Sequence, residues 1–304
     1  MRNARSVWTE DVRIWPKSMR TMKSIASAFS RFGQAMATAF WAAASTSISE
    51  PALDPRAERL QPPSVYSRWW SMTESCSGLQ GQMSKVSWYQ VPGSDVVDSN
   101  GEDVAGYWGP ISNSIVLAGN GILFGDLVRH EMLHALVREQ SGHSRAFFLE
   151  KCAGVVSCGP KCRSDAGPAP SIDPMVQRVS SDVLELSVSV VPEHPTSSVD
   201  EGVFAIIVAA HNPNPYPVVV TLNPSALNKT FFYSLFTPVG GIGNWELALD
   251  NGVTHFGPGA TKRQYFDLSI GTRNDGRTVP PGLYTIYGGY NNRRIEVKNF
   301  VLAP

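Results

Sequence analysis

Hydrophobic and polar positions alternate in the C-terminal part of the chain. The clearest run places aliphatic residues at every second position, Leu184, Leu186, Val188 and Val190. This two-residue period is typical of a half-buried strand. Further short strand-like runs are expected at 204–210, 218–222, 231–236, 245–249, 265–268, 283–287 and 295–302. Turn signals such as Asn274-Asp275-Gly276 and Pro280-Pro281-Gly282 separate them, which predicts an antiparallel β-sandwich over residues 182–304.

The preceding part of the chain mixes strand and helix patterns. Short strand-like runs at 86–91, 104–108 and 115–118 are followed by one strongly helical segment, Asp126 to Glu139. The stretch 163–181 contains three prolines and no periodic apolar pattern. We therefore expect a first domain over 65–162 and an interdomain linker over 163–181.

The N-terminal residues differ in composition from the rest. Counted from Met22, Lys23 and Arg31 supply positive charge, Ala35 to Trp41 a short apolar core, and Ala42-Ala43-Ala44 a cleavage site. This order predicts a signal or targeting segment over 1–44 and a secreted, periplasmic or cell-envelope protein. An amphipathic or disordered arm in a cytoplasmic protein is the alternative. The Pro-rich stretch 45–64 is interpreted as a tether outside the fold.

Composition narrows the class of protein. The chain has 304 residues, with 26 Lys and Arg against 26 Asp and Glu, so its formal net charge is zero. A neutral chain lacks the broad basic footprint of a nucleic-acid-binding protein, and we expect no nucleic-acid partner. No apolar run reaches the roughly 18 residues of a membrane-spanning helix, so we expect no integral membrane segment in the mature chain.

Four cysteines, an even number, favour disulfides in an exported chain. Three of them, Cys152, Cys158 and Cys162, form a cluster, and Cys76 is distant from it. At least one bridge should therefore join Cys76 to the cluster, with all three connectivities open. The spacing of the cluster does not match a structural zinc site. In a cytoplasmic protein these residues would be buried thiols.

The helical segment DLVRHEMLHALVRE carries the candidate chemistry. Asp126 is placed to cap its N-terminus, and His130 and His134 stand one turn apart on one face. Glu131 follows the first histidine. This H-E-x-x-H pattern presents two imidazoles to a zinc ion, Zn2+, and a carboxylate to a water molecule.

A third protein ligand is needed for catalytic zinc. His143 follows a turn at Gln140-Ser141-Gly142 and is expected at the start of a second helix over Ser144 to Cys152. The string Gly142 to Phe147 after H-E-x-x-H resembles SprT-like metallopeptidases and related zincins, a resemblance that covers about 25 residues and implies His143 as the third ligand. Glu150 is the alternative, by a gluzincin-like reading.

The C-terminal sandwich weakly resembles domains of the intracellular proteinase inhibitor type. The shared strings are His211-Asn212-Pro213 after one strand and Pro281-Gly282-Leu283-Tyr284 at the start of another. The resemblance implies architecture only, and no inhibitory activity. The expected fold class is α+β, with a small zincin-like metallopeptidase domain followed by an all-β, immunoglobulin-like sandwich. His194, His211 and His255 fall in the sandwich and are interpreted as surface or packing residues.

The expected activity is hydrolysis of peptide bonds in a peptide or protein substrate. His130, His134 and His143 leave one zinc position for water, and Glu131 is the general base. By resemblance to zincins, the strand at Ser114 to Ala118 is the candidate edge for the substrate. Three residues are considered for stabilising the oxyanion, and the sequence does not choose among them: Tyr107, Arg129 and Arg145.

A different class of function is also open. The chain could be an exported binding or adhesion protein with an inactive or structural zinc site, its sandwich binding a protein or surface ligand. Glu131 separates the two hypotheses, because a structural site has no use for an unliganded carboxylate beside its ligands. Its presence favours an enzyme.

Overall fold

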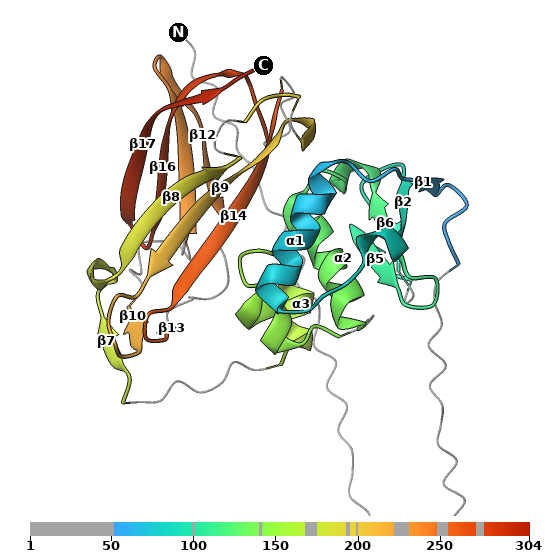
Figure 1. Cartoon of the computed structure of the whole chain (residues 1–304), viewed down its shortest axis with the longest axis horizontal. Helices are drawn as coiled ribbons and strands as arrows, with labels where there is room; N and C mark the ends of the chain where they lie inside the picture. The colour runs from blue at the N-terminus through green and yellow to red at the C-terminus, as the bar shows by residue number, and fades with distance from the viewer. Residues whose placement is uncertain are drawn as a thin grey trace, which may run out of the picture. The chain divides into compact units, whose positions relative to one another are not determined.

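The computed structural model describes residues 52–98, 101–139, 142–167, 175–192, 195–198, 200–221, 231–247, 255–271 and 277–304, with only the backbone of 240–247. The predicted signal segment and the first residues of the predicted tether, up to 51, lie outside the described residues. Residues Ile48–Pro304 form one compact unit, drawn in Figure 1.

The first half is built on a four-stranded sheet in the order β1-β2-β6-β5. Its strands are β1 (Glu58–Arg59), β2 (Ser87–Val91), β6 (Ser114–Ala118) and β5 (Gly106–Gly109). β6 runs parallel to β2 and antiparallel to β5. A small hairpin of β3 (Val96–Val97) and β4 (Asp103–Val104) precedes β5. The strands predicted at 86–91 and 115–118 are confirmed, whereas the one predicted at 104–108 is divided between β4 and β5.

Two packed helices supply the rest of this half, α1 (Val65–Ser77) and α2 (Gly125–Val137). They share a core with the sheet in which the largest fully buried side chains are Tyr66, Trp69, Ile115, Leu117 and Met132. Sequence analysis did not predict α1. Its buried residues nevertheless follow helical spacing, Val65, Trp69 and Thr73, and Gly78 ends it in the left-handed conformation.

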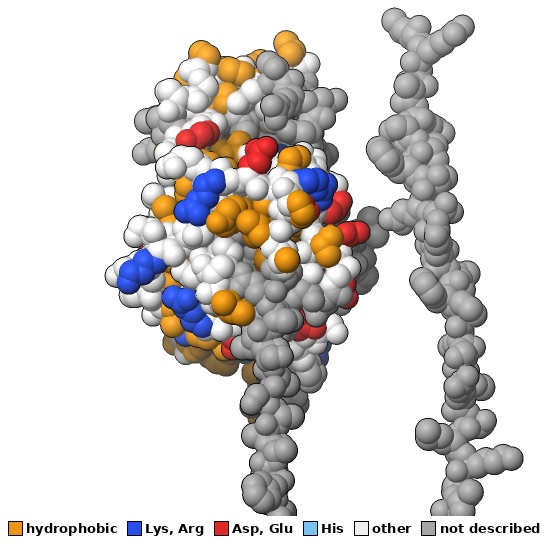
Figure 2. Space-filling view, turned by 90° about the vertical axis from the view of Figure 1, so that its right-hand side faces the viewer, with side chains coloured by type: hydrophobic (Ala, Val, Ile, Leu, Met, Phe, Trp, Pro, Cys, Tyr) orange, Lys and Arg blue, Asp and Glu red, His pale blue; other side chains and the backbone are white. Residues whose placement is uncertain are grey.

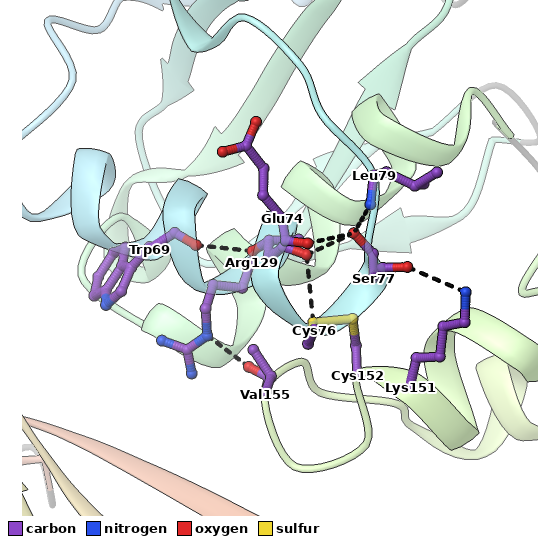
Figure 3. The surroundings of a disulfide bond; sticks show 10 residues. Trp69, Glu74, Cys76, Ser77, Leu79, Arg129, Lys151, Cys152 and Val155 are labelled. Atoms are coloured by element: carbon purple, nitrogen blue, oxygen red, sulfur yellow. Dashed lines mark hydrogen bonds between the residues drawn. A yellow bond between two sulfur atoms is a disulfide. The ribbon is translucent and has the colours of Figure 1, made fainter.

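Two disulfides hold the segment after α2. Cys76 of α1 is bonded to Cys152, and Cys158 to Cys162. Cys152 directly follows a π-helical turn, Ala146–Lys151, and Cys162 lies in α3 (Pro160–Asp165). Figure 3 shows the first disulfide, beside which Lys151 Nζ donates to the Ser77 carbonyl at 3.2 Å. The predicted bridge from Cys76 to the cluster is confirmed, and two disulfides indicate an oxidising, extracellular environment.

The second half consists mainly of two four-stranded sheets around one core. One has the order β15-β14-β9-β8 and the other β12-β11-β16-β17. Phe204, Ile206, Leu235 and Ile286 are among the buried residues between them. The strands of the first sheet are β8 (Glu185–Val191), β9 (Val203–His211), β14 (Thr261–Ile270) and β15 (Thr278–Val279). Those of the second are β11 (Phe231–Thr237), β12 (Gly240–Leu247), β16 (Gly282–Tyr290) and β17 (Arg293–Leu302).

A three-stranded sheet, β13-β10-β7, completes this half. It contains β13 (His255–Phe256), β10 (Val218–Val220) and β7 (Gln177–Val179). The alternating exposure of β8 confirms the strand predicted from its two-residue period. The described chain therefore combines helices and strands, as an α+β protein does. The zincin and immunoglobulin-like assignments remain predictions.

Two predicted boundaries differ from the structure. β1 lies within the predicted tether, where it pairs with β2, and Leu60 next to it is buried. The predicted linker begins inside α3, which starts at Pro160, and it contains β7, which pairs with β10. The prolines of this stretch indicated a linker. Strands as short as β1 and β7, which pair with distant segments, leave no local pattern from which they could be predicted.

Polar contacts join the two halves. The guanidinium of Arg129 in α2 donates two hydrogen bonds to Asp267 of β14, at 3.1 and 2.7 Å, and both side chains are fully buried. At the end of the predicted tether, the Ser64 amide donates to Glu201 at 2.9 Å. Asp126, the second residue of α2, accepts a hydrogen bond from Arg277 at 2.9 Å. The expected N-cap role of Asp126 is thus wrong, since Phe124 occupies that position.

The described surface carries charges of both signs. On the face in Figure 2, basic, acidic and hydrophobic side chains are intermingled. Among the helices of the described ranges, none has the length and apolar character needed to cross a membrane.

Candidate metal centre

Three imidazole rings meet beside α2. His130 and His134 lie one turn apart on this helix, and His143 reaches them from the segment that follows. The helix ends at Val137, because Arg138 adopts a left-handed conformation with φ 66°. This turn brings the Glu139 carbonyl back to His134.

Each ring is oriented by an oxygen acceptor on its Nδ1. His130 Nδ1 lies 2.6 Å from the Ser157 carbonyl, and His134 Nδ1 lies 2.6 Å from the Glu139 carbonyl. His143 Nδ1 lies 3.0 Å from the Asp165 carboxylate. An oxygen of this kind only accepts, so each Nδ1 carries the hydrogen and donates it. Every Nε2 is then left with a lone pair in the neutral ring.

These three lone pairs converge. His130 Nε2 lies 3.2 Å from Nε2 of His134 and 3.2 Å from Nε2 of His143. Three ligands in a tetrahedron around zinc, each at 2.0–2.1 Å, have nitrogens separated by about 3.3 Å. The rings therefore have both the spacing and the tautomers of a metal site, and an imidazole set of this kind suits zinc.

The protein keeps these rings neutral. Burial, reinforced by His143, lowers the pKa of His130 to about 4. Burial also lowers the pKa of His134 well below its usual value. For His143, burial again lowers the pKa, although Asp165 opposes the shift. Neutral imidazole is the form that binds a metal.

Phe148 supports all three rings from one side. Its buried ring lies 5.0, 4.8 and 5.0 Å from those of His130, His134 and His143, respectively. Phe148 belongs to the π-helical turn, which begins at Ala146. The expected second helix is thus shorter than predicted, and His143 precedes it.

Glu131 borders the same cavity of about 380 Å³ as the three histidines. Its side chain is buried, and burial raises its pKa to about 8. No hydrogen-bond donor to its carboxylate is found among the described residues. A Cβ built on Gly106 of β5 would lie 3.4 Å from Glu131 Cγ, so this strand passes next to the glutamate side chain.

Of the other candidate residues, only the tyrosine lies at this cavity. Tyr107 lines this cavity, whereas Arg129 and Arg145 do not. Arg129 is occupied by Asp267 and by the Val155 carbonyl, and Arg145 donates to the Gly167 carbonyl. Glu150, the alternative third ligand, is exposed and borders a different cavity of about 520 Å³.

The predicted substrate edge is wrong. β6 lies between β2 and β5 and is paired on both sides, so its backbone groups are already used. β5 ends the sheet instead, and its residues Gly106, Tyr107 and Trp108 line the cavity of the histidines. β5 is short and its sequence has no distinctive pattern, so this edge was not predicted.

The site includes three residues that sequence reasoning did not assign to it. Asp165 orients His143, Ser157 supplies the acceptor for His130, and Phe148 supports the rings. In addition, the ligand atoms of His130, His143 and Cys162 all lie within 4.8 Å of one another. Ser157 and Asp165 lie close to Cys158 and Cys162 in the sequence, and this was the available signal. A bridge between the two cysteines fixes the segment around them.

Comparison with known proteins identifies neither a matching family model nor a matching curated protein. One similar solved structure is the Pseudomonas fluorescens alkylpurine DNA glycosylase AlkC bound to DNA with an abasic site analogue. It has 14% identity and a TM-score of 0.28, over 40% of this chain and 31% of the glycosylase. A structural-genomics target has 14% identity and a TM-score of 0.23, with 41% and 89% covered. A Bordetella pertussis protein assigned as ApaA has 20% identity and a TM-score of 0.22, with 42% and 96% covered.

Proposed function

We propose that this protein is an exported, zinc-dependent metallopeptidase of the zincin type with an immunoglobulin-like domain. The approach of His130 Nε2 to within 3.2 Å of both His134 Nε2 and His143 Nε2 carries the proposal. Lone pairs this close repel one another unless a cation lies between them. All three Nδ1 atoms already donate to oxygen. Turning one ring so that its N–H pointed between the rings would break one of these hydrogen bonds.

His130, His134 and His143 would hold the metal. Three protein ligands would leave one coordination position for water, as in catalytic zinc sites. When bound, zinc supplies a Lewis acid that polarises a carbonyl and lowers the pKa of water towards about 7.

Glu131 is assigned as the general base. It follows His130 directly, so its side chain projects about 100° around the helix from that ligand. From this position it lines the same cavity without replacing a ligand. It accepts the proton of the attacking water and returns one to the leaving amine. A cation beside it would favour the carboxylate form and offset the effect of burial on its pKa.

β5 is proposed as the edge on which an extended peptide binds. Adding a strand at this edge uses backbone hydrogen bonds that depend little on side chains. The peptide would lie along Gly106 to Trp108, with its scissile carbonyl over the histidines. Tyr107 lines the cavity, and its hydroxyl is the proposed donor to a developing oxyanion.

The test compares Glu131→Gln with His134→Ala in a broad peptide-library digest. Glutamine keeps the size of the side chain but cannot accept a proton at neutral pH. We expect Glu131→Gln to lower hydrolysis by about 100-fold or more with the wild-type zinc content, and His134→Ala to lose zinc and activity together. Glu150→Gln, at the other cavity, is the matched control and should match the wild type. Full activity of Glu131→Gln would refute the mechanism.

The alternative function is that of a binding protein with a structural zinc site. It predicts a zinc-loaded wild type that is inactive on every peptide, and unchanged ligand binding in Glu131→Gln. The unligated, buried carboxylate of Glu131 favours the enzyme, because burying it without a partner is costly and a structural site gains nothing from it.

A further inference from the structure

We propose that Cys162 is a fourth metal ligand when its disulfide with Cys158 is reduced, so that the site is open only in the oxidised protein. This inference rests on the proposed metal site. It assigns a role to a residue outside the H-E-x-x-H pattern, and it makes the redox state of one disulfide the control of access to the metal.

The position of the sulfur carries the proposal. Cys162 Sγ lies within 4.8 Å of the ligand nitrogens of His130 and His143. Cys162 is 5% exposed and lines the same cavity as the three histidines and Glu131. It belongs to α3, the helix whose Asp165 orients His143. The sulfur is therefore close to two of the three proposed ligands, on an element that is already part of the site.

The disulfide determines whether this sulfur can bind. A thiolate, and not a disulfide sulfur, is the form of cysteine that ligates a metal. A zinc–sulfur bond of about 2.3 Å beside zinc–nitrogen bonds of about 2.0–2.1 Å places sulfur about 3.6 Å from each nitrogen. The sulfur lies within 4.8 Å of ligand nitrogens of His130 and His143, so it needs to approach these two rings by about 1 Å, which a side-chain rotation supplies once Cys158 is released.

The reaction balances with an ordinary thiol reductant. A dithiol gives two electrons to the Cys158–Cys162 bond, becomes a disulfide itself, and its two protons yield two cysteine thiols. The Cys162 thiol then releases its proton to solvent as the sulfur binds the metal. Sulfur in the fourth position excludes water, and the proposed hydrolysis stops. A disulfide compound reoxidises the pair: it takes two electrons and two protons, becomes two thiols, and leaves Cys158 and Cys162 bonded again, which restores the open site.

Such a device matches the predicted export. In a reducing compartment the three histidines and Cys162 would form a closed site, and the enzyme would be silent before secretion. In an oxidising compartment the disulfide withdraws the sulfur. The bridge between Cys76 and Cys152 ties α1 to the segment after the π-helical turn, and neither of its sulfurs is part of the metal-ligating group.

Cobalt(II) provides a readout independent of catalysis. The experiment compares the wild type, Cys158→Ser, and the double variant Cys158→Ser/Cys162→Ser, each loaded with Co2+. Cys158→Ser fixes Cys162 as a thiol, whereas the double variant lacks the disulfide and the thiol alike. Both leave Cys76–Cys152 intact, and thiol labelling verifies one free cysteine in the first and none in the second.

We expect a sulfur-to-cobalt charge-transfer band in the near ultraviolet for Cys158→Ser only. Hydrolysis should be lost in this variant and present in the other two proteins. Reducing the wild type with a water-soluble phosphine, which takes oxygen from water to form a phosphine oxide, should produce the same band. If the Cys158→Ser protein does not fold, the reduced wild type still tests whether Cys162 binds the metal.

The outcomes separate the two proposals. Cobalt ligand-field bands in all three proteins without a charge-transfer band in Cys158→Ser or the reduced wild type would overturn the role of Cys162 and leave the metal site standing. A charge-transfer band together with no hydrolysis by any protein would support the ligand and overturn the peptidase. Failure of the wild type to bind cobalt or zinc would overturn both.

Discussion

At the scale of single residues, the acceptors behind the imidazoles decide the chemistry of the site. Two are backbone carbonyls, of Ser157 and Glu139, and the third is the side chain of Asp165. Each fixes the hydrogen on Nδ1 and so turns an unprotonated Nε2 toward the other rings. Asp165 is the acceptor that a substitution can remove without changing the backbone.

Asp165→Ala should weaken zinc affinity by about 10- to 100-fold, the usual effect of losing a ligand's hydrogen-bond partner. His143 would then be free to rotate, and the positive charge of the metal would lose a nearby carboxylate. Competition with a chromophoric chelator measures the affinity. Glu150→Ala, which removes an exposed carboxylate at the other cavity, is the control. Equal affinities in both variants would show that Asp165 does not act on His143.

At the scale of elements, α2 carries the site on one face and a buried ion pair on another. Arg129 stands between the ring of Trp69 and that of Tyr265, 5.8 Å from each, and its guanidinium is paired with Asp267. A Cβ built on Gly125 would lie 2.6 Å from Arg129 Nη1, so the start of the helix must be glycine for the pair to approach. The pair therefore fixes the helix that holds His130 and His134.

Asp267→Ala should lower the free energy of unfolding by about 3–5 kcal/mol, because it leaves the Arg129 charge buried without its partner. Urea denaturation monitored by circular dichroism measures the change. Glu296→Ala breaks an exposed pair with Lys298 and should change stability little. If Arg129→Met is combined with Asp267→Leu, most of the loss should be recovered, since an apolar pair replaces the ionic one. A loss as small as that of Glu296→Ala would indicate that water reaches Arg129.

Sequence predicted best the features that depend on neighbours along the chain. The one-turn spacing of His130 and His134 and the alternation in β8 are local patterns, and both elements are present. The strand order is not local. The pattern of Ser114 to Ala118 indicates a strand but does not reveal that β2 and β5 flank it. Likewise, nothing near Asp126 in the sequence shows that Arg277, 151 residues away, donates a hydrogen bond to its carboxylate.

At the scale of the whole molecule, two cores coexist with shared polar contacts. The first core surrounds Trp69 and Met132, and the second surrounds Phe204 and Ile286. Each has its own sheets, which is the basis for predicting two domains. Between them, the Tyr265 amide donates to the Gly154 carbonyl at 3.1 Å, in addition to the ion pairs of α2. A Cβ at Gly154 would lie 2.0 Å from the Arg263 carbonyl, so the backbones meet closely there.

A protease recognition sequence inserted between Gly167 and Met175 tests how far the halves depend on each other. After cleavage we expect both fragments to elute together in size-exclusion chromatography, because Val203 packs in the core around Trp69 and Tyr265 packs against the cluster around Phe148, and separation would expose this apolar surface. The same cut in an Asp267→Ala background should release the C-terminal fragment, with the circular dichroism of an all-β domain that retains its own core. Zinc should remain with the N-terminal fragment, since His130, His134 and His143 all precede the cut. Dissociation of the cleaved wild type at once, with zinc still bound, would show that the metal centre needs no support from the sandwich.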